Sequence, residues 1–90
     1  MDHQLFRQQL TTEGFDEVFD KTLPAGQFVA AHNHPFAVKA LVTSGEVALG
    51  VAGVETTYRT GDVFAMPRGC EHTERYGDAG VSYVVGRKHH

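Results

Sequence analysis

The chain has 90 residues, enough for one small domain with one modest hydrophobic core. Its formal net charge is −3 and no cluster of basic residues interrupts it, so the electrostatic signature of a nucleic-acid-binding protein is missing. No apolar run is longer than the four residues 28–31, far short of the roughly 20 residues that span a bilayer. The lone Cys70 cannot form an internal disulfide. We therefore expect a soluble, cytoplasmic protein with no nucleic-acid or membrane partner.

The N-terminal residues 1–14 differ from the rest of the chain. The stretch 4–10 offers one or two helical turns before the turn signal at Gly14. We predict a short N-terminal arm or helical turn over residues 1–14, a single domain over residues 15–88 and a C-terminal tail at residues 89–90.

From residue 15 onward, short apolar runs alternate with turn signals. This pattern leaves no room for a crossover helix, which excludes parallel α/β folds, and it places turns at residues 44–45 and 77–80. Many short strands at regular spacing indicate an all-β sandwich or small barrel, for which the jelly roll is the eight-strand solution. The predicted strands are residues 18–23, 27–34, 38–43, 46–51, 55–59, 63–66, 70–76 and 81–85.

Three histidines form a candidate metal site. His32 and His34 are separated by one residue in a predicted strand, and the alternation of a strand puts both imidazoles on one face. His72, on another predicted strand, would complete a three-nitrogen site that suits Zn, Fe, Ni or Cu. Taken alone, the His32 and His34 pair is weak evidence for a metal site, because such a pair more often has a structural or surface role.

The spacing of glycines around these histidines resembles two motifs of the cupin superfamily. Gly26, five residues, His32-Asn33-His34 and then Gly45 resemble the first motif. The second motif is matched by Gly61, Pro67, Gly69 and His72. The resemblance implies a cupin-type double-stranded β-helix, a jelly-roll barrel of six to eight strands, and it implies a metal held by His32, His34 and His72.

Two positions depart from the cupin pattern. The family places a Glu four residues after the second histidine of the first motif, and here that residue is Val38. Lys39, one residue further on, would face away from the histidines. The last position of the second motif, an Asn in the family, is Tyr76. The usual carboxylate ligand is therefore missing from its place.

Three neutral imidazoles would leave a divalent ion with its full +2 charge and two or three open positions, which favours anionic or oxygen-rich ligands. Glu74 shares its strand face with His72 and Tyr76, so it is a candidate for an outer-sphere base or a fourth ligand, the alternative being a solvated surface carboxylate. Glu74 and Tyr76 are the candidate proton-transfer residues.

The remaining candidates have plainer interpretations. Cys70 either packs in the barrel or lies near the metal as a thiolate. The terminal residues His3, His89 and His90 are expected to lie outside the site. We expect solvated charges, and no site residue, at Arg59, Arg68, Arg75 and Arg87.

Three functions are compatible with this sequence. The first is a small metal-binding cupin that holds Zn, Fe, Ni or Mn through its histidines beside a small organic ligand or substrate. If it is an enzyme, the resemblance implies a three-His metal-dependent dioxygenase or an isomerase. The second is a ligand-binding or sensor cupin without metal, and the third a barrel whose histidines only fill space. A barrel this small leaves sheet edges exposed, so we expect a homodimer.

Overall fold

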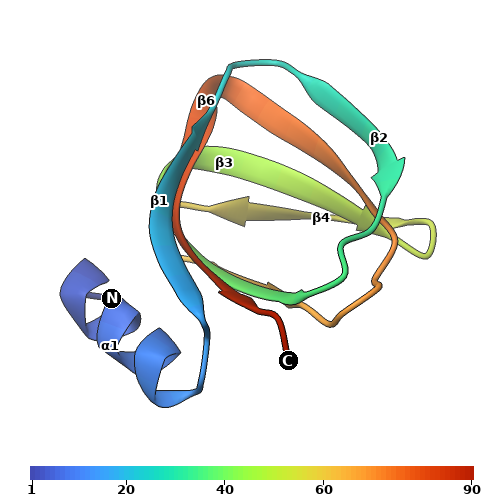
Figure 1. Ribbon diagram of the computed structural model, residues 1–90. Coiled ribbons are helices and arrows are strands. Elements are labelled where there is room, and N and C mark those ends of the chain that lie inside the picture. The colour runs from blue at the N-terminus through green and yellow to red at the C-terminus, as the bar shows by residue number, and fades with distance from the viewer.

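One helix and six strands make up the structure, a computed structural model that describes residues 1–90 (Figure 1). The strands all pair antiparallel, which confirms the all-β prediction. None of the chain's helical structure is long and apolar enough to span a membrane. The elements are α1 (His3–Thr12), β1 (Glu17–Leu23), β2 (Phe28–His32), β3 (Ala37–Val51), β4 (Val54–Arg59), β5 (Val63–Met66) and β6 (His72–Lys88).

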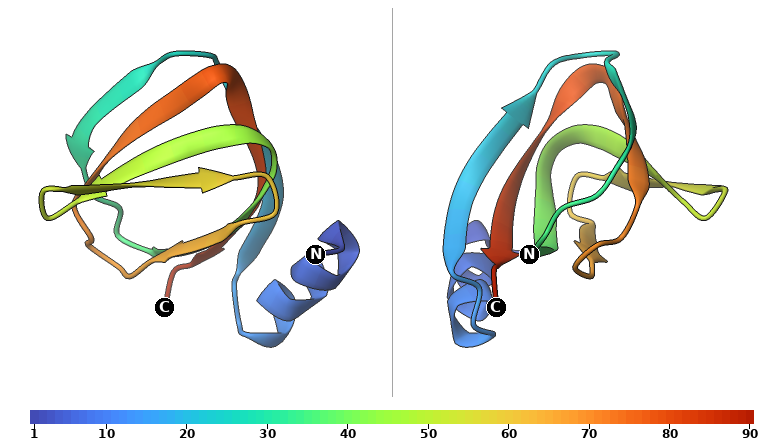
Figure 2. Two further views of the ribbon diagram at one scale, coloured as in Figure 1. Left: turned by 180° about the vertical axis from the view of Figure 1, so that it is seen from behind. Right: turned by 45° about the vertical axis from the view of Figure 1, so that its right-hand side comes forward.

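The two long strands, β3 and β6, organise the sheet. They pair with each other along their whole length, and each half of each strand takes a different second neighbour. β2 pairs with the first half of β6 and β1 with the second half, whereas β5 pairs with the first half of β3 and β4 with the second half. Figure 2 shows from two further directions that the strands curve around a common interior.

The predicted strands 38–43 and 46–51 are one continuous strand, β3. Ser44 and Gly45, predicted as a turn, instead form an irregularity at which the pairing register with β6 shifts. Gly45 has φ +69°, and a Cβ placed on it would lie 2.0 Å from the carbonyl oxygen of Gly80. The residue types that signal a turn also serve in a β-bulge, which bends a strand without ending it. The prediction of a separate strand here is therefore wrong.

The same correction applies to β6. The predicted strands 70–76 and 81–85 and the predicted turn at 77–80 form a single strand that begins at His72. β2 is also shorter than predicted, because it ends at His32 and not at residue 34. The sheet therefore has six strands, two of them long and bent, in place of eight short ones.

The barrel interior is filled by alternate residues of the strands, as the two-residue period of a strand requires. Partly buried side chains of β1 and β2 pack against this inner core at its margin. Its eleven buried residues are Val38, Ala40, Val42, Val47, Leu49, Phe64, Met66, Tyr76, Val81, Tyr83 and Val85.

Helix α1 covers part of the outer face of the barrel (Figure 1). The side chain of Asp2 caps the helix by accepting a hydrogen bond from the Leu5 N–H at 3.0 Å. Phe6 and Leu10 are fully buried against residues of the outer face of β3 and β6. The predicted helical turns therefore extend to a ten-residue helix with its own small core. The sequence pattern showed only two apolar residues four positions apart, which is a weak helical signal.

Candidate metal centre

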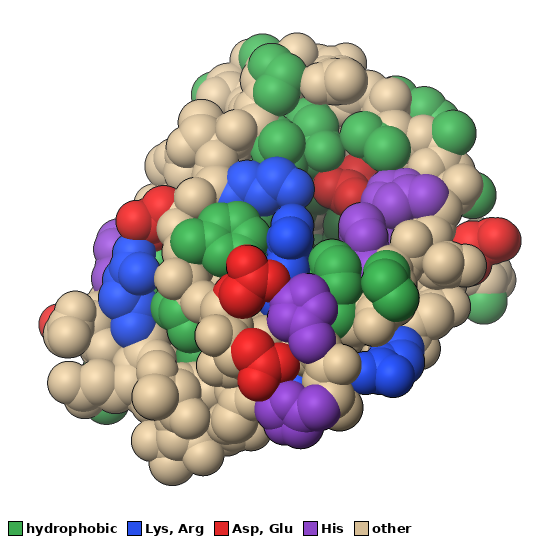
Figure 3. Space-filling view, viewed as in Figure 1, with side chains coloured by type: hydrophobic (Ala, Val, Ile, Leu, Met, Phe, Trp, Pro, Cys, Tyr) green, Lys and Arg blue, Asp and Glu red, His purple; other side chains and the backbone are tan.

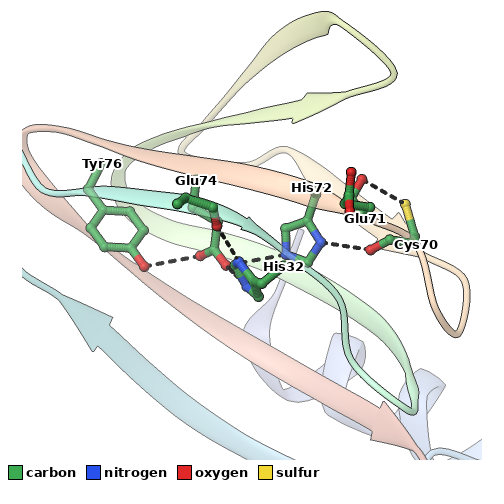
Figure 4. Close-up of polar contacts among 7 residues, drawn as sticks. His32, Cys70, Glu71, His72, Glu74 and Tyr76 are labelled. Carbon is green, nitrogen blue, oxygen red and sulfur yellow. Dashed lines mark hydrogen bonds and ion pairs between the residues drawn. The ribbon is translucent and has the colours of Figure 1, made fainter.

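His32 and His72 lie directly opposite each other on neighbouring strands. His32 is the last residue of β2, His72 is the first residue of β6, and the two are paired in the register of the sheet. His34 follows β2 in the loop, and Glu74 lies two residues beyond His72 on the same face of β6. Figure 4 shows the side chains of His32, His72 and Glu74 converging from the two strands. The structure therefore brings together the three predicted histidines and Glu74.

The four side chains form a compact donor set. One ligand atom from each of His32, His34, His72 and Glu74 lies within 4.8 Å of the others. Glu74 Oε2 is 3.1 Å from His32 Nε2 and 3.3 Å from His72 Nε2. Two ligands about 2.1 Å from one metal ion are separated by about 3.0 Å at a right angle and about 3.4 Å at a tetrahedral angle. Both contacts with Glu74 fall within that range, so this set could hold a metal ion.

Backbone carbonyls fix the orientation of two of the imidazoles. His32 Nδ1 is 2.8 Å from the Ala30 oxygen, and His72 Nδ1 is 3.0 Å from the Cys70 oxygen. A carbonyl oxygen only accepts hydrogen bonds, so each Nδ1 carries a proton, and in the neutral form that binds metal ions the lone pair of Nε2 points toward Glu74. Lone pairs facing a carboxylate repel it, and a cation between them removes the repulsion. Metal-ligating histidines commonly have such an outer hydrogen bond from the second ring nitrogen to a backbone carbonyl.

His34 completes the set from the loop after β2. Its ring stacks on Phe36 with a centroid distance of 4.9 Å and an interplanar angle of 13°. Burial, reinforced by the neighbouring rings of His32 and His72, lowers the pKa of His34 from its usual value of 6.5. Metal ions bind the neutral imidazole, so this environment favours the ligating form at neutral pH.

Tyr76 holds the other oxygen of the carboxylate. Its hydroxyl donates a hydrogen bond to Glu74 Oε1 at 3.1 Å (Figure 4). Burial, followed by the negative charge of Glu74, raises the pKa of Tyr76 well above its usual value. The phenol therefore stays protonated and acts as a hydrogen-bond donor. Of the two alternatives for Glu74, the structure supports the inward position over a solvated one. A metal ion in this cluster would therefore face one carboxylate in addition to the three neutral imidazoles.

The position of the missing family carboxylate is apolar, as the sequence indicated. Val38 is buried in the inner core, and its side chain lines the cavity beside the cluster. Lys39 faces the other way, where its Nζ lies 2.9 Å from Glu13 Oε1. Neither residue supplies a ligand to the cluster. The carboxylate comes from β6 instead of β3.

A cavity of about 40 Å³ lies inside the barrel next to the cluster. His34 and Glu74 line one side of it, apolar residues of the inner core line the walls, and Lys21 and Arg87 also line it. Figure 3 shows basic, acidic and histidine side chains gathered around one hollow on this face. The prediction that Arg87 is a solvated surface charge is wrong, because Arg87 continues the inward series of Val81, Tyr83 and Val85 on β6.

Lys21 was not singled out from the sequence. It lies between Phe19 and Leu23 on β1, two residues that pack against the inner core. The two-residue period of the strand therefore turns Lys21 inward as well. The signal that could have identified both cations was strand parity, applied to charged residues as well as to apolar ones.

The other candidates lie apart from the cluster. Cys70 is half-buried and packs against the inner core, which supports its packing interpretation. His3 is the first residue of α1. At the C-terminus, His89 contacts Glu17, and His90 Nδ1 lies 3.0 Å from Asp16 Oδ1.

Comparison with known proteins identifies the architecture. The family model described as "Cupin domain" matches residues 19–85. No curated protein matches the chain. A structure of unknown function from Rhizobium leguminosarum bv. viciae 3841 superposes with a TM-score of 0.75 at 19% identity, covering 81% of this chain and 69% of that one.

Two further structures are similar. An uncharacterised conserved protein with a double-stranded β-helix domain from Klebsiella pneumoniae has a TM-score of 0.66 and 26% identity, covering 79% of this chain and 64% of its own. The DMSP lyase DddQ from Ruegeria pomeroyi DSS-3 has a TM-score of 0.70 and 24% identity, and the match covers 79% of this chain but 36% of the lyase. These similarities show a double-stranded β-helix, which confirms the predicted fold.

Proposed function

The chain belongs to the cupin domain family, and from that premise we propose that His32, His34, His72 and Glu74 bind one divalent metal ion beside a small-ligand cavity. The observation that carries the proposal is the contact of His32 Nε2 and His72 Nε2 with a single oxygen of Glu74, at 3.1 and 3.3 Å. Both rings have their Nδ1 atoms engaged by backbone carbonyls. This orientation leaves both Nε2 atoms facing the space in which a metal ion would lie, which supports the proposal.

The donor set defines the class of metal. Three imidazole nitrogens and one carboxylate oxygen suit Zn, Fe, Ni or Mn. One carboxylate lowers the charge of the bound ion from +2 to a net +1, and four protein ligands leave room for further ligands in a six-coordinate site. When bound, the ion would supply Lewis acidity, or redox chemistry in the case of iron.

The proposed roles of Glu74 and Tyr76 follow from their contacts. Glu74 is a metal ligand and not a free base, since one of its oxygens faces the histidines and the other accepts the Tyr76 hydrogen bond. Tyr76 is a positioning residue that holds the carboxylate. Neither is left free for the proton transfer that the sequence suggested. The proposed metal site therefore does not depend on a catalytic role for either residue.

The test is metal stoichiometry. A protein truncated before residue 89, to remove the terminal histidines, is reconstituted separately with Zn, Fe, Ni and Mn and analysed for bound metal. We expect about one equivalent in the parent, almost none in His32→Ala and His72→Ala, and an unchanged equivalent in the control His3→Ala. Absence of metal in the parent under all four conditions would favour the metal-free sensor or space-filling alternatives.

The finer expectations on assembly and location also belong to this proposal. We propose that the protein is cytoplasmic and that it forms a homodimer. The homodimer is supported by the exposed apolar side chains of Phe28 and Val54, which are 49% and 66% exposed. Light scattering coupled to gel filtration should give twice the chain mass. A monomer mass at micromolar concentration would contradict it.

A further inference from the structure

Two positively charged side chains point toward the barrel interior, one from β1 and one from the second half of β6. Lys21 of β1 is paired across the sheet with Tyr83 of β6, and Arg87 lies four residues further along β6. Both residues are half-buried and both line the same cavity as His34 and Glu74. The cavity is thus lined by one carboxylate, one imidazole and two cations.

These two cations have no acidic partner. No carboxylate oxygen lies within 4.0 Å of the charged nitrogens of either residue, whereas several cations on the outside of the barrel do have one. The outward cations in such ion pairs are Arg7, Lys39, Arg59 and Arg75. Arg68 and Lys88 also lack an acidic partner, so what distinguishes Lys21 and Arg87 is that both line the interior cavity.

The guanidinium of Arg87 is held by aromatic rings. Its Cζ lies 4.9 Å from the centroid of Phe19 and 4.7 Å from that of Phe36. Cation–π contacts of this kind fix the plane of the group and leave its N–H donors available. Phe36 also stacks on His34, so one ring connects the cation to the metal cluster.

Unpaired, partly buried like charges are unfavourable, and the attraction of an anion placed between them offsets both their desolvation and their mutual repulsion. A guanidinium binds a carboxylate through two parallel hydrogen bonds, and an ammonium adds a third. The space of about 40 Å³ has room for about three water-sized groups, at roughly 10–15 Å³ each. The group that fits is therefore compact.

We propose that Lys21 and Arg87 form a carboxylate-binding site and that the ligand of this protein is a small organic carboxylate. Its carboxylate contacts these two residues, and an oxygen at its other end faces the metal. This inference rests on the proposed function for the metal end of the ligand only. The carboxylate end depends on Lys21 and Arg87 alone.

Glycolate is a suitable probe because it carries a carboxylate and one further oxygen, and glycolamide is its neutral counterpart. Calorimetric titrations of both into the zinc-loaded protein compare the wild type with Lys21→Gln and Arg87→Gln. Arg59→Gln is the matched control, since it removes the same charge from an outward side chain that is 69% exposed. Zinc stoichiometry and thermal unfolding are measured for every variant.

We expect glycolate to bind the wild type more tightly than glycolamide, and to lose at least about 10-fold in affinity in either glutamine variant, because a hydrogen bond to a charged group is lost. Arg59→Gln should retain binding, and all variants should keep one zinc. Equal glycolate affinity in the wild type, Lys21→Gln and Arg87→Gln would overturn the proposal. So would failure of glycolate to bind the folded wild type.

The same titrations on metal-free protein separate this inference from the proposed function. If the wild type takes up no zinc, the metal proposal fails. Glycolate binding that still depends on Lys21 and Arg87 would then support the carboxylate site on its own.

Discussion

His32 and His72 are a cross-strand pair whose two Nε2 atoms face the same carboxylate oxygen. That oxygen belongs to Glu74, two residues beyond His72 on the same strand face. The position at which the cupin pattern has its carboxylate is the buried Val38. The chain thus supplies a three-histidine, one-carboxylate donor set with the acidic residue on a different strand from the usual one.

Replacing the carboxylate by its amide tests whether Glu74 is a ligand. We expect Glu74→Gln to lower metal affinity by about 10–100-fold or more. Removing a residue that only hydrogen-bonds to a metal ligand already costs that much, and Glu74 would be a ligand itself. Competition with a chromophoric chelator measures the change. Glu71→Gln is the control, because Glu71 is an exposed carboxylate on the preceding segment. Equal affinities for the two variants would show that Glu74 does not bind the metal.

Removing the Tyr76 hydroxyl tests its role as a positioning residue. Tyr76→Phe keeps the buried ring and deletes the hydrogen bond to Glu74 Oε1. A net contribution of about 0.5–1.5 kcal/mol per hydrogen bond corresponds to a loss of roughly 2- to 10-fold in metal affinity, with stoichiometry unchanged. Complete loss of the metal would instead assign Tyr76 a direct part in the site.

The lowered pKa of His34 makes the stability of the metal-free protein depend on pH. Because the folded state binds this proton less readily than the unfolded chain does, the stability that the neutral ring contributes is complete above about pH 6.5. It is lost as the pH falls through 6.5 toward the lower pKa of the folded state. Urea unfolding between pH 7.5 and 5 should show a larger loss for the wild type than for His34→Gln. Parallel curves would contradict the assignment.

The same protons compete with the metal, since ligating imidazoles must be neutral. We expect metal bound at pH 7.5 to be released by dialysis at pH 5. Unchanged occupancy at pH 5 would count against a histidine site.

The bend of β3 depends on Gly45. Gly45→Ala would place a Cβ 2.0 Å from the Gly80 carbonyl oxygen in addition to the cost of its positive φ. Gly53→Ala carries a similar φ, +81°, with no atom within 4 Å of the new Cβ, so it isolates the backbone cost of about 1 kcal/mol or more. Chemical denaturation should show Gly45→Ala to be clearly the less stable of the two. Equal stabilities would mean that the close approach to Gly80 is relieved by a small shift.

The sequence was sufficient for the fold class and for the three histidines. Alternation along a predicted strand put His32 and His34 on one face, although His34 in fact reaches the cluster from the loop after β2. The spacing of Gly61, Pro67, Gly69 and His72 carried the resemblance to the family. The continuity of β3 and β6 could not be predicted, because a bulge and a turn are built from the same residue types and only the pairing partner distinguishes them.

The site was predictable only in part, because the contacts between side chains on different strands could not be predicted from the sequence. Strand parity pointed Glu74 inward, whereas the usual exposure of glutamates favoured a solvated side chain. The choice between the two depended on the distance of Glu74 from the histidines. Arg87 was misassigned because charge was taken as sufficient evidence of exposure. Its parity with Tyr83 and Val85 pointed inward, and the Phe19 and Phe36 rings that hold it come from β1 and from the segment before β3.

X-ray absorption spectroscopy of the zinc-loaded protein, truncated before residue 89, tests the central claim most directly. The proposed site predicts a first shell of nitrogen and oxygen at about 2.0–2.1 Å with scattering from three imidazoles. It also predicts that one imidazole is lost from this signal in His34→Ala. A sulfur shell at about 2.3 Å, which Cys70 would provide, or a signal without imidazole scattering would contradict the account.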